Sequence, residues 1–438
     1  MSALEIGILS VPSLMVLIFI RIPIGMSMFL VGLVGISLVT GGTNIALARL
    51  KSETYSAFSS YSLSIVPMFL LMGHFATLGG MSSALFKAAE GFLGHRKGGV
   101  AMASIGACAG FGSICGSSLA TAATMGRVAL PELKQYGYAG GFSTATLAAG
   151  GTLGILIPPS VVLVIYAILT EQNIAKLFLA AVVPGIMAAL GYVVAISIYV
   201  RIHPDAAGTR PAVPMADRFR ALVKVWPVLL VFGMVVGGIY LGWFTPTEGA
   251  AVGAFGTGLI ALINGGLTRE TLIESFIVTA QSTAMVFFII LGAAFYNGFL
   301  AFTEVPQELS GYVVSQGFSP WTVLTLILIF YLVFGCLMDS LSMILLTIPI
   351  FFPVMLVLDF GMSEEHVAIW FGILVLIVVE VGLITPPVGM NLFVINAMDR
   401  RTPIVETYKA VGYFVLSDLA RVVLLVLFPT ITLFLIGK

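Results

Sequence analysis

Gly154-Ile155-Leu156-Ile157-Pro158-Pro159 and Gly382-Leu383-Ile384-Thr385-Pro386-Pro387 are the two stretches of this chain that decide its fold. Each is a Gly-x-x-x-Pro-Pro motif deep inside apolar sequence that would otherwise form one continuous helix. Two successive prolines remove two amide donors and clash with carbonyls one turn earlier, so a helix breaks there. In lipid, the freed backbone groups are tolerated only where they face protein, ions or a watery cavity. Both motifs therefore predict interrupted helices around a protected, polar place.

The composition is that of a polytopic membrane protein. Of the 438 residues, 59% are hydrophobic and 9% are charged, and the mean hydropathy is +1.11; a soluble domain carries about 25% charged residues. The net charge of +0 offers nucleic acid no electrostatic attraction. Cys108, Cys115 and Cys336 lie in apolar segments and predict neither a disulfide framework nor a metal site. The N-terminus lacks a basic region, so we expect a retained first helix rather than a cleaved signal peptide.

Ten segments are apolar over the roughly 20 residues that a bilayer crossing needs. We expect crossings at 5–22, 24–42, 58–80, 141–170, 176–200, 222–243, 247–265, 276–300, 366–397 and 411–436. Two other apolar segments, 99–133 and 319–357, are too long for one crossing and carry small, polar residues at their centres. We interpret both as re-entrant helical hairpins, which reach the midplane and return to the same side.

Basic residues orient these segments, because cytoplasmic loops of membrane proteins are enriched in Lys and Arg. The loops 81–98, 201–221 and 398–410 are assigned to the cytoplasm, and the loops 301–318 and 358–365 to the outside. Ten crossings with non-crossing hairpins then leave both termini outside, that is, periplasmic. Arg49 and Lys51, in a loop assigned to the outside, are the one discordant pair. The hydrophilic run 203–220 is the obvious linker between two halves.

The two halves repeat one pattern. Ser118 and Ser340 are 222 residues apart, and Pro158 and Pro386 are 228 apart; three other matched positions have similar offsets. Each half has five expected crossings, an odd number, so the halves must be inverted relative to each other. Paired interrupted helices in inverted halves are typical of secondary transporters with alternating access.

The chain divides accordingly into scaffold and transport segments. We expect 1–80 as scaffold helices of the first repeat, 81–170 as arm, first hairpin and broken helix, 171–221 as scaffold helix and cytoplasmic linker, 222–300 as scaffold helices of the second repeat, 301–397 as arm, second hairpin and broken helix, and 398–438 as the final scaffold helix. Segments 81–94 and 268–276 are candidate interfacial arm helices.

Each hairpin centre combines backbone breakers with hydroxyl groups. The first holds Gly116-Ser117-Ser118 followed by Thr121 and Thr124, and the second holds Asp339-Ser340 followed by Ser342 and Thr347. Unwound carbonyls and hydroxyls suit sodium, and helix N-termini suit a carboxylate substrate. Each half can therefore build a cation site between its hairpin and its Pro-Pro break, with the substrate between the two. The alternative is that these hydroxyls only bond the preceding turn or allow close helix packing.

Five charged or titratable residues stand out. Asp339 is a candidate sodium ligand, proton carrier or partner of a substrate hydroxyl, since an intramembrane carboxylate is functional by default; the alternative is a surface position at a shallow tip. Glu380 is interpreted as bracing the second break by accepting amide hydrogen bonds, or as a substrate contact. Arg127 either snorkels to the cytoplasmic interface or contacts the substrate anion or the hairpin. Glu248 is expected to support a helix start, and His74 to pack.

The chain resembles the large membrane subunit of tripartite ATP-independent periplasmic (TRAP) transporters, the DctM-like family. The resemblance covers nearly the whole chain. It is carried by Gly112-Ser113-Ile114-Cys115-Gly116-Ser117-Ser118-Leu119-Ala120-Thr121, Gly151-Thr152-Leu153-Gly154-Ile155-Leu156-Ile157-Pro158-Pro159-Ser160, Thr245-Pro246-Thr247-Glu248, Met338-Asp339-Ser340 and Glu380-Val381-Gly382-Leu383-Ile384-Thr385-Pro386-Pro387-Val388-Gly389.

The resemblance implies an all-α elevator transporter of the ion transporter superfamily in the bacterial inner membrane, driven by a sodium gradient. It implies a small four-helix (DctQ-like) membrane subunit, a periplasmic substrate-binding protein, and organic-acid substrates such as C4-dicarboxylates or sialic acid. Sodium is the expected coupling ion, and no organic cofactor is expected. The implied sodium ligands are Ser113, Gly116, Ser117, Ser118, Gly154, Ile157, Pro159, Asp339, Ser340, Gly382, Thr385 and Val388. The substrate-binding candidates are Thr121, Thr152, Ser160, Asp339, Ser342, Glu380 and Arg127.

Three other functions are weighed against this one. A stand-alone sodium- or proton-coupled carboxylate carrier or antiporter of the same superfamily would need no binding protein. An intramembrane enzyme would need an Asp-rich magnesium motif, a Ser/His pair or His-Glu-x-x-His, and the sequence contains none of these, so we expect no enzyme activity. A passive channel fits paired hairpins in inverted halves less well than alternating access does.

Overall fold

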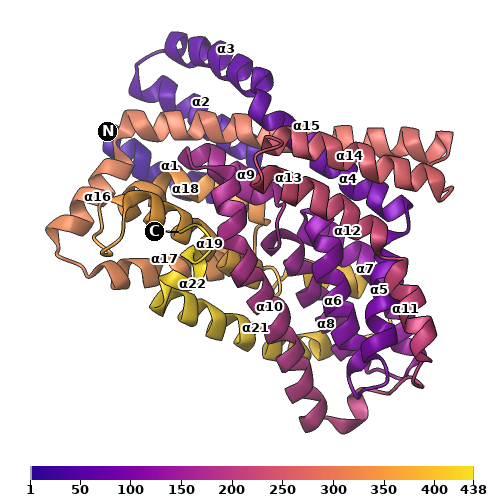
Figure 1. The fold of residues 1–438 in the computed structure, drawn as a ribbon. Helices are drawn as coiled ribbons and strands as arrows, with labels where there is room; N and C mark the ends of the chain where they lie inside the picture. The colour runs from indigo at the N-terminus through magenta and orange to yellow at the C-terminus, as the bar shows by residue number, and fades with distance from the viewer. Residues whose placement is uncertain (1, 438) are drawn as a thin grey trace.

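The computed structural model describes residues 2–437, and the regular secondary structure of this range is helical (Figure 1). The first half contains α1 (Ala3–Phe19), α2 (Ile24–Val39), α3 (Thr43–Ser59), η1 (Tyr61–Ser64), α4 (Ile65–Leu78), α5 (Met81–Leu93), α6 (Gly99–Cys115), α7 (Ser118–Gln135), α8 (Gly140–Leu156), α9 (Val161–Thr170) and α10 (Ile174–Ile202). A linker carries η2 (Pro204–Ala206) and α11 (Met215–Val223). The second half contains α12 (Trp226–Phe232), η3 (Gly233–Gly237), α13 (Gly238–Tyr240), α14 (Pro246–Ile263), α15 (Arg269–Thr303), α16 (Val305–Ser315), α17 (Pro320–Gly335), α18 (Ser340–Leu356), α19 (Glu364–Gly382), α20 (Met390–Met398), α21 (Ile404–Leu427) and α22 (Pro429–Leu433).

Prolines and capping side chains set where these helices begin. Pro23 precedes α2, and Pro246 opens α14 directly after Thr245. Proline suits the first helical turn because its missing amide would have no partner there. Glu248 accepts a hydrogen bond from the Thr245 amide at 2.8 Å, while the Thr245 hydroxyl accepts one from the Glu248 amide at 3.3 Å. This capping box confirms that Glu248 supports a helix start.

Seven helical stretches in the described chain are long and apolar enough to cross a membrane, and an eighth forms if α8 and α9 count as one span bent by 43°. The apolar helices α1 and α2 are slightly shorter, with 17 and 16 residues. The multi-pass membrane architecture expected from the composition is therefore confirmed. The exact total of ten crossings and their orientation stay predictions.

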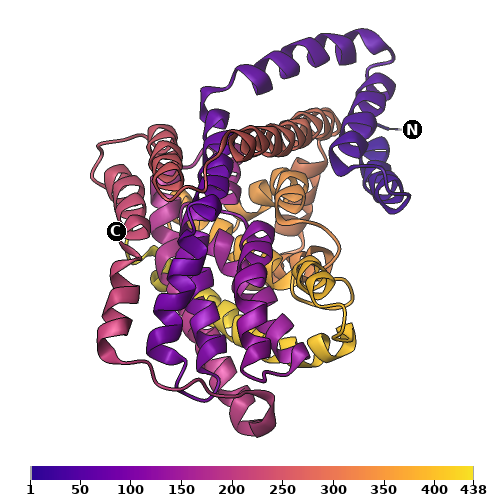
Figure 2. The same ribbon diagram turned by 90° about the vertical axis from the view of Figure 1, so that its right-hand side faces the viewer.

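One expectation about local structure is wrong. Residues 268–276 do not form a separate arm helix, because no Gly or Pro interrupts the chain there and α15 continues unbroken for 35 residues. Two connections between expected crossings also contain helix. Residues 43–59 form α3, which lies at the outer edge of the molecule (Figure 2), and α11 begins within the hydrophilic linker.

The two halves follow the same order of elements from α5 and α16 onward. Each half has a short helix, a helix–turn–helix pair, an interrupted helix and then a long helix. The halves also interlock, since α2 packs along α15 and α4 packs along α14. Glycines allow this approach: a Cβ on Gly32 would lie 2.8 Å from the backbone carbon of Phe295. The halves therefore share one interior.

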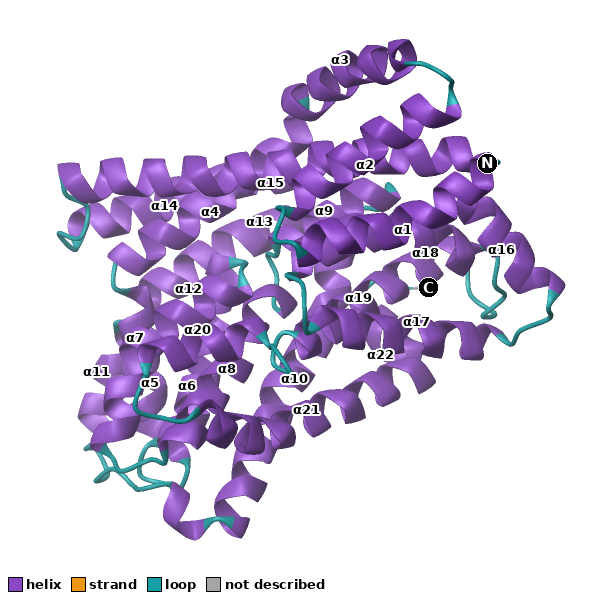
Figure 3. Cartoon of the chain, turned by 180° about the vertical axis from the view of Figure 1, so that it is seen from behind, coloured by secondary structure: helices purple, strands orange, loops and turns teal. Residues whose placement is uncertain are grey.

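Four interruptions bring loop backbone among the helices (Figure 3). The turn between α6 and α7 is Gly116-Ser117, and the turn between α17 and α18 spans 336–339. The breaks expected from the Pro-Pro motifs are present, at 157–160 between α8 and α9 and at 383–389 between α19 and α20. Both Pro-Pro peptide bonds are cis. The sequence therefore correctly predicted where helices stop inside apolar segments.

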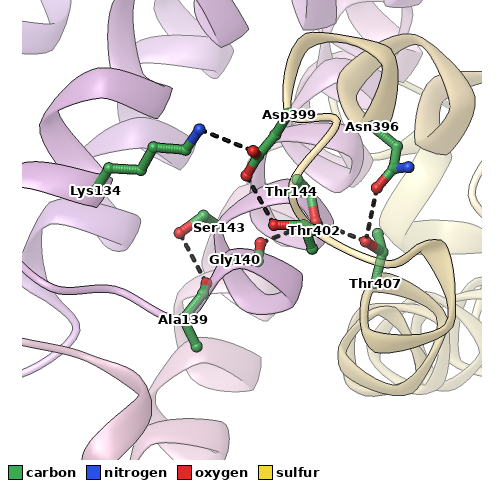
Figure 4. A network of polar contacts seen from close by, with 9 residues as sticks. All are labelled: Lys134, Ala139, Gly140, Ser143, Thr144, Asn396, Asp399, Thr402 and Thr407. Carbon is green, nitrogen blue, oxygen red and sulfur yellow. Dashed lines mark hydrogen bonds and ion pairs between the residues drawn. The ribbon is translucent and has the colours of Figure 1, made fainter.

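A polar network away from these breaks joins the first hairpin to the end of the second broken helix (Figure 4). Lys134, near the end of α7, donates to Asp399 at 2.8 Å, and Asp399 also accepts from the Thr402 hydroxyl at 2.8 Å. Beside them the Thr144 and Thr407 hydroxyls lie 2.8 Å apart. Burial of Asp399 raises its pKa, but the hydrogen bonds from Lys134 and Thr402 outweigh burial, and the pKa is lowered overall.

We expect Asp399→Asn to reduce stability by about 1–3 kcal/mol at pH 7, because Lys134 loses a charged acceptor. A lowered folded-state pKa contributes stability above the unfolded value of about 3.9, and this contribution is lost as the pH falls through the folded value. The deficit in melting temperature, measured in detergent, should therefore stay constant from pH 7 to about pH 5 and shrink as the pH falls below about 4. Asp217→Asn, which removes the exposed 2.9 Å pair with Arg220, is the control and should change little. A deficit that does not shrink below about pH 4 would contradict the assignment.

Candidate functional site

Both hairpin turns open onto one cavity of about 200 Å³. The first hairpin contributes Gly116, Ser117 and Ser118, and the second contributes Asp339 and Ser340. The breaks and scaffold helices close the remaining walls, with Ile155, Val161, Val162 and Leu383 from the broken helices, Leu70 from α4, and Ser282, Met285 and Val286 from α15. Five of the sequence-predicted ligands, far apart in the chain, thus share one wall.

The two turns place matching residues at matching positions. Ser117 caps α7 by accepting from the Ala120 amide at 3.4 Å, and Asp339 caps α18 by accepting from the Ser342 amide at 3.1 Å. Gly116 precedes the first cap with φ +65°, a left-handed conformation that glycine adopts at little cost. Asp339 is half-buried and lines the cavity, so it is not the surface residue of a shallow tip.

Each hairpin lies directly against the interrupted helix of its own half. A Cβ on Gly112 would lie 2.6 Å from the Gly154 Cα, and a Cβ on Gly382 would lie 2.7 Å from the Gly335 Cα. The Ser117 carbonyl is equally close to Gly154, since a Cβ there would meet that oxygen at 2.7 Å. In the second half the Gly389 amide donates to the Cys336 carbonyl at 3.3 Å. The hairpin and the broken helix of each half are thus in direct backbone contact.

Glu380 binds the two hairpin turns together. Its side chain is buried, and it accepts hydrogen bonds from the Ser118 hydroxyl and, at 2.6 Å, from the Ser340 hydroxyl. The expectation that Glu380 braces the break by accepting amide hydrogen bonds is therefore wrong, because the hydroxyls of both hairpins reach its carboxylate first. Its carboxylate lies behind the two serines, and Glu380 is not among the described residues that line the cavity.

The remaining predicted ligands have more local hydrogen bonds. Ser113 donates to the Gly110 carbonyl at 2.8 Å and Thr385 to the Val381 carbonyl at 2.6 Å. Ile157 and Val388 are half-buried in the two breaks, and Pro159 is buried. The carbonyl of Pro159 would lie 3.1 Å from a Cβ on Gly116. The first break thus presents a backbone oxygen to the first turn.

The hydroxyl groups of the substrate candidates differ in their hydrogen-bond partners. Ser160 caps α9 by accepting from the Leu163 amide at 3.3 Å. The buried hydroxyls of Thr121 and Ser342 have no hydrogen-bond partner among the described residues. Thr152 is turned away from the cavity, because its hydroxyl lies 2.8 Å from the Tyr192 hydroxyl. It therefore does not share a wall with Ser118 or Asp339.

Arg127 lines a neighbouring cavity of about 240 Å³. His74 and Thr124 line the same space, and Ser117 borders both this cavity and the first one. Arg127 is exposed, with a 3.5 Å contact to the Thr124 hydroxyl. His74, which was expected to pack, is half-buried at the wall of this cavity. A cationic side chain thus lies next to the space between the turns.

Sequence reasoning missed a buried polar chain behind the first break. The Tyr192 hydroxyl donates to Asp418 at 2.7 Å, and Asp418 pairs with Arg421 at 2.7 Å. Arg421 also donates to the Pro184 carbonyl at 3.2 Å. The signal was available, since Asp418 and Arg421 are charged residues inside an apolar segment and such residues are expensive there. This network anchors α21 to α10.

The chemistry of the site is that of neutral and anionic oxygen donors. The polar residues that line the first cavity carry hydroxyl groups and the Asp339 carboxylate, and the rest of the lining is largely apolar. Within residues 2–437, no group of three or more His, Cys, Asp and Glu side chains is placed to hold a metal ion. Oxygen donors on unwound backbone are the type of ligand that holds sodium in secondary transporters.

We expect Arg421→Ala to destabilise the protein strongly, by about 3–5 kcal/mol, because it leaves the buried Asp418 carboxylate without its cation. Arg220→Ala, which removes the exposed pair with Asp217, should cost at most about 1 kcal/mol. Thermal unfolding and size-exclusion profiles in detergent compare the two variants. Equal melting temperatures would mean that the buried pair does not stabilise the fold.

Known proteins are similar to this chain in sequence and in fold. The chain matches the family described as "Tripartite ATP-independent periplasmic transporter, DctM component" over residues 11–431. It is 35% identical over 389 residues to the C4-dicarboxylate TRAP transporter large permease protein DctM of Pseudomonas aeruginosa, covering 89% of each chain. It is 30% identical over 425 residues to the sialic acid TRAP transporter permease protein SiaT of Haemophilus influenzae, covering 96% of this chain and 66% of that protein.

A solved structure has the same fold at low sequence identity. The Alcanivorax borkumensis YdaH transporter aligns with a TM-score of 0.63 and 14% identity, over 88% of this chain and 89% of that one. The family match, in contrast, rests on sequence over nearly the whole length. The chain therefore belongs to the DctM component family of tripartite ATP-independent periplasmic transporters.

Proposed function

We propose that this chain is the large permease subunit of a sodium-driven, binding-protein-dependent importer of small organic acids. One observation carries the proposal: two hairpin turns and the helices around two breaks, one of each from each half, surround a single cavity whose polar lining consists of hydroxyl groups and one carboxylate. Such an arrangement suits a bound cation, because unwound backbone inside a membrane protein is tolerated only where it faces protein, an ion or a watery space.

Each half contributes one sodium site in this proposal. The first lies between the hairpin residues Ser113–Ser118 and the break at 157–160, and the second between Asp339-Ser340 and the break at 383–389. The close contact of each hairpin with its own broken helix supports this division. The Asp339 carboxylate supplies a full negative charge at the second site, and a bound cation compensates the cost of burying it.

Transport follows an elevator mechanism in this proposal. The hairpins and broken helices form a transport domain, and α1, α2, α4, α14 and α15 belong to the scaffold. The common order of elements in the two halves supports an inverted repeat with re-entrant hairpins. Alternating access then moves the cavity as a unit past α4 and α15, which supply the remaining wall through Leu70, Met285 and Val286.

The substrate is an organic anion, on three grounds. Helices α7 and α18 begin at the cavity, and the N-terminus of a helix favours a carboxylate. Arg127 lies in the adjoining cavity as a cation. Relatives are named for C4-dicarboxylate and sialic acid, both carboxylates. The C4-dicarboxylates and sialic acid are therefore the first substrates to test.

The word "tripartite" in the family description means that this component works with others. We propose a small four-helix, DctQ-like membrane subunit and a periplasmic binding protein as those partners, in the bacterial inner membrane with both termini periplasmic. Specificity would then be shared with the binding protein, which delivers the substrate to the large subunit.

Uptake into proteoliposomes tests this function. The vesicles contain both membrane subunits, with the binding protein added outside and radiolabelled succinate or sialic acid as substrate. Accumulation should require an inward sodium gradient and the binding protein, and it should collapse when choline replaces sodium. Uptake that is independent of the binding protein would instead favour a stand-alone carrier.

Asp339→Asn separates the charge of this residue from its structural role. Asparagine caps a helix about as well as aspartate, so α18 should form and the protein should insert and remain monodisperse. Sodium-driven uptake should nevertheless be lost, because the second site loses its negative charge. Asp217→Asn, on an exposed linker helix, serves as the control. Wild-type uptake by Asp339→Asn would remove Asp339 from the ion site.

A further inference from the structure

We propose that Glu380 is a positioning residue that couples the two hairpin turns, so that a cation bound at one turn strengthens cation binding at the other. This inference rests on the proposed function, since it assigns a regulatory contact to the same cavity. It goes beyond that function because it concerns a side chain behind the site and predicts cooperativity between the two halves.

The geometry places one carboxylate between two equivalent hydroxyls. Ser118 is the first residue of α7 and Ser340 the first residue of α18, so each lies directly after a capped turn. Ser118 donates to one Glu380 oxygen and Ser340 to the other, at 2.6 Å. All three side chains are buried. The α19 helix that carries Glu380 thereby holds hairpins from both halves through a single group.

These hydrogen bonds determine which serine atoms face the cavity. A hydroxyl has one hydrogen and two lone pairs, and in both serines the hydrogen is donated to Glu380. Ser118 and Ser340 also line the cavity, so their oxygens can act toward it only as acceptors. Acceptor oxygens are what a cation requires. A partner that fixes the ligand in this way commonly changes ion affinity by about 10–100-fold.

The same contact provides a path for coupling. A cation that draws the Ser118 oxygen toward the first turn changes its distance to Glu380, and Glu380 holds Ser340 at the second turn. Such coupling is reciprocal, because each site must affect the other by the same factor. A contact of this kind occurs at only one of the two breaks in the described chain. The matching position in the first motif is Thr152, whose hydroxyl contacts Tyr192 on α10 instead.

Sodium titration of the purified full-length chain in detergent tests the coupling. Choline chloride keeps the ionic strength constant, and the heat of sodium binding at a fixed temperature reports occupancy, because a melting temperature keeps rising after the sites are filled. The wild type should respond sigmoidally, with a Hill coefficient above about 1.5 for two coupled sites. Glu380→Gln keeps the volume but offers one acceptor oxygen and one NH2 donor, so it can orient only one serine.

We expect Glu380→Gln to raise the half-saturating sodium concentration about tenfold or more and to lower the Hill coefficient to about 1. The matched control is Glu90→Gln, another buried carboxylate, which pairs with Arg210 at 2.5 Å. Glu90 lies on α5, before the whole 17-residue length of α6 that separates it from the first turn. The cooperativity of sodium binding in the Glu90→Gln variant should equal that of the wild type, even if the melting temperature of the variant without sodium changes.

The outcomes separate the two proposals. A cooperative response retained by Glu380→Gln overturns the coupling and leaves the sodium function intact, and so does a sodium response of the wild type without cooperativity. A wild type that does not respond to sodium overturns the proposed function itself. If Glu380→Gln does not fold, the coupling is tested with the single variants Ser118→Ala and Ser340→Ala and with the double variant that combines them. Fold-changes in half-saturating sodium that simply multiply in the double variant contradict coupling, and a smaller combined change supports it.

Discussion

The structure depends on one constraint: every backbone amide and carbonyl released by a helix break within an apolar interior must find a partner. Gly154-x-x-x-Pro-Pro and its counterpart at Gly382 create such groups in two places. The molecule meets the constraint by bringing a hairpin turn against each break, at glycines that permit backbone-to-backbone contact. The cavity follows from this solution, because turns and breaks that face each other leave oxygen atoms around a common space.

Helix-capping hydrogen bonds stabilise these turns. Ser117 and Asp339 each accept an amide hydrogen bond at the start of a helix, so each of them fixes where the second helix of its hairpin begins. The residue after each cap is a serine that donates to Glu380. Structure and ion chemistry therefore use neighbouring atoms: the caps fix the backbone, and the hydroxyls present acceptor oxygens to the cavity. An exchange that preserves the cap but changes the charge can distinguish these contributions.

Much of the fold could be predicted from hydropathy and from breaker residues. The apolar segments, both hairpins, both helix breaks and the family were found from residue pattern. One error concerns the start of α15, which was expected as a separate arm helix. Helix formation needs only the absence of breakers, so α15 continues through this segment. The role of Glu380 was misjudged because its partners, Ser118 and Ser340, lie on other elements.

The sequence by itself determined that the chain enters a membrane, where its helices stop, and which hydroxyl and carboxyl groups lie beside those stops. These are local properties, set by the missing amides of proline, the φ angles open to glycine and the apolar length of each segment. Only the tertiary structure decided which of these groups meet. Glu380 reaches Ser118 across 262 positions of the chain, and Thr152, at the matching position of its own motif, turns to Tyr192 instead. Contacts between distant elements depend on how the helices pack, and no local pattern encodes that packing.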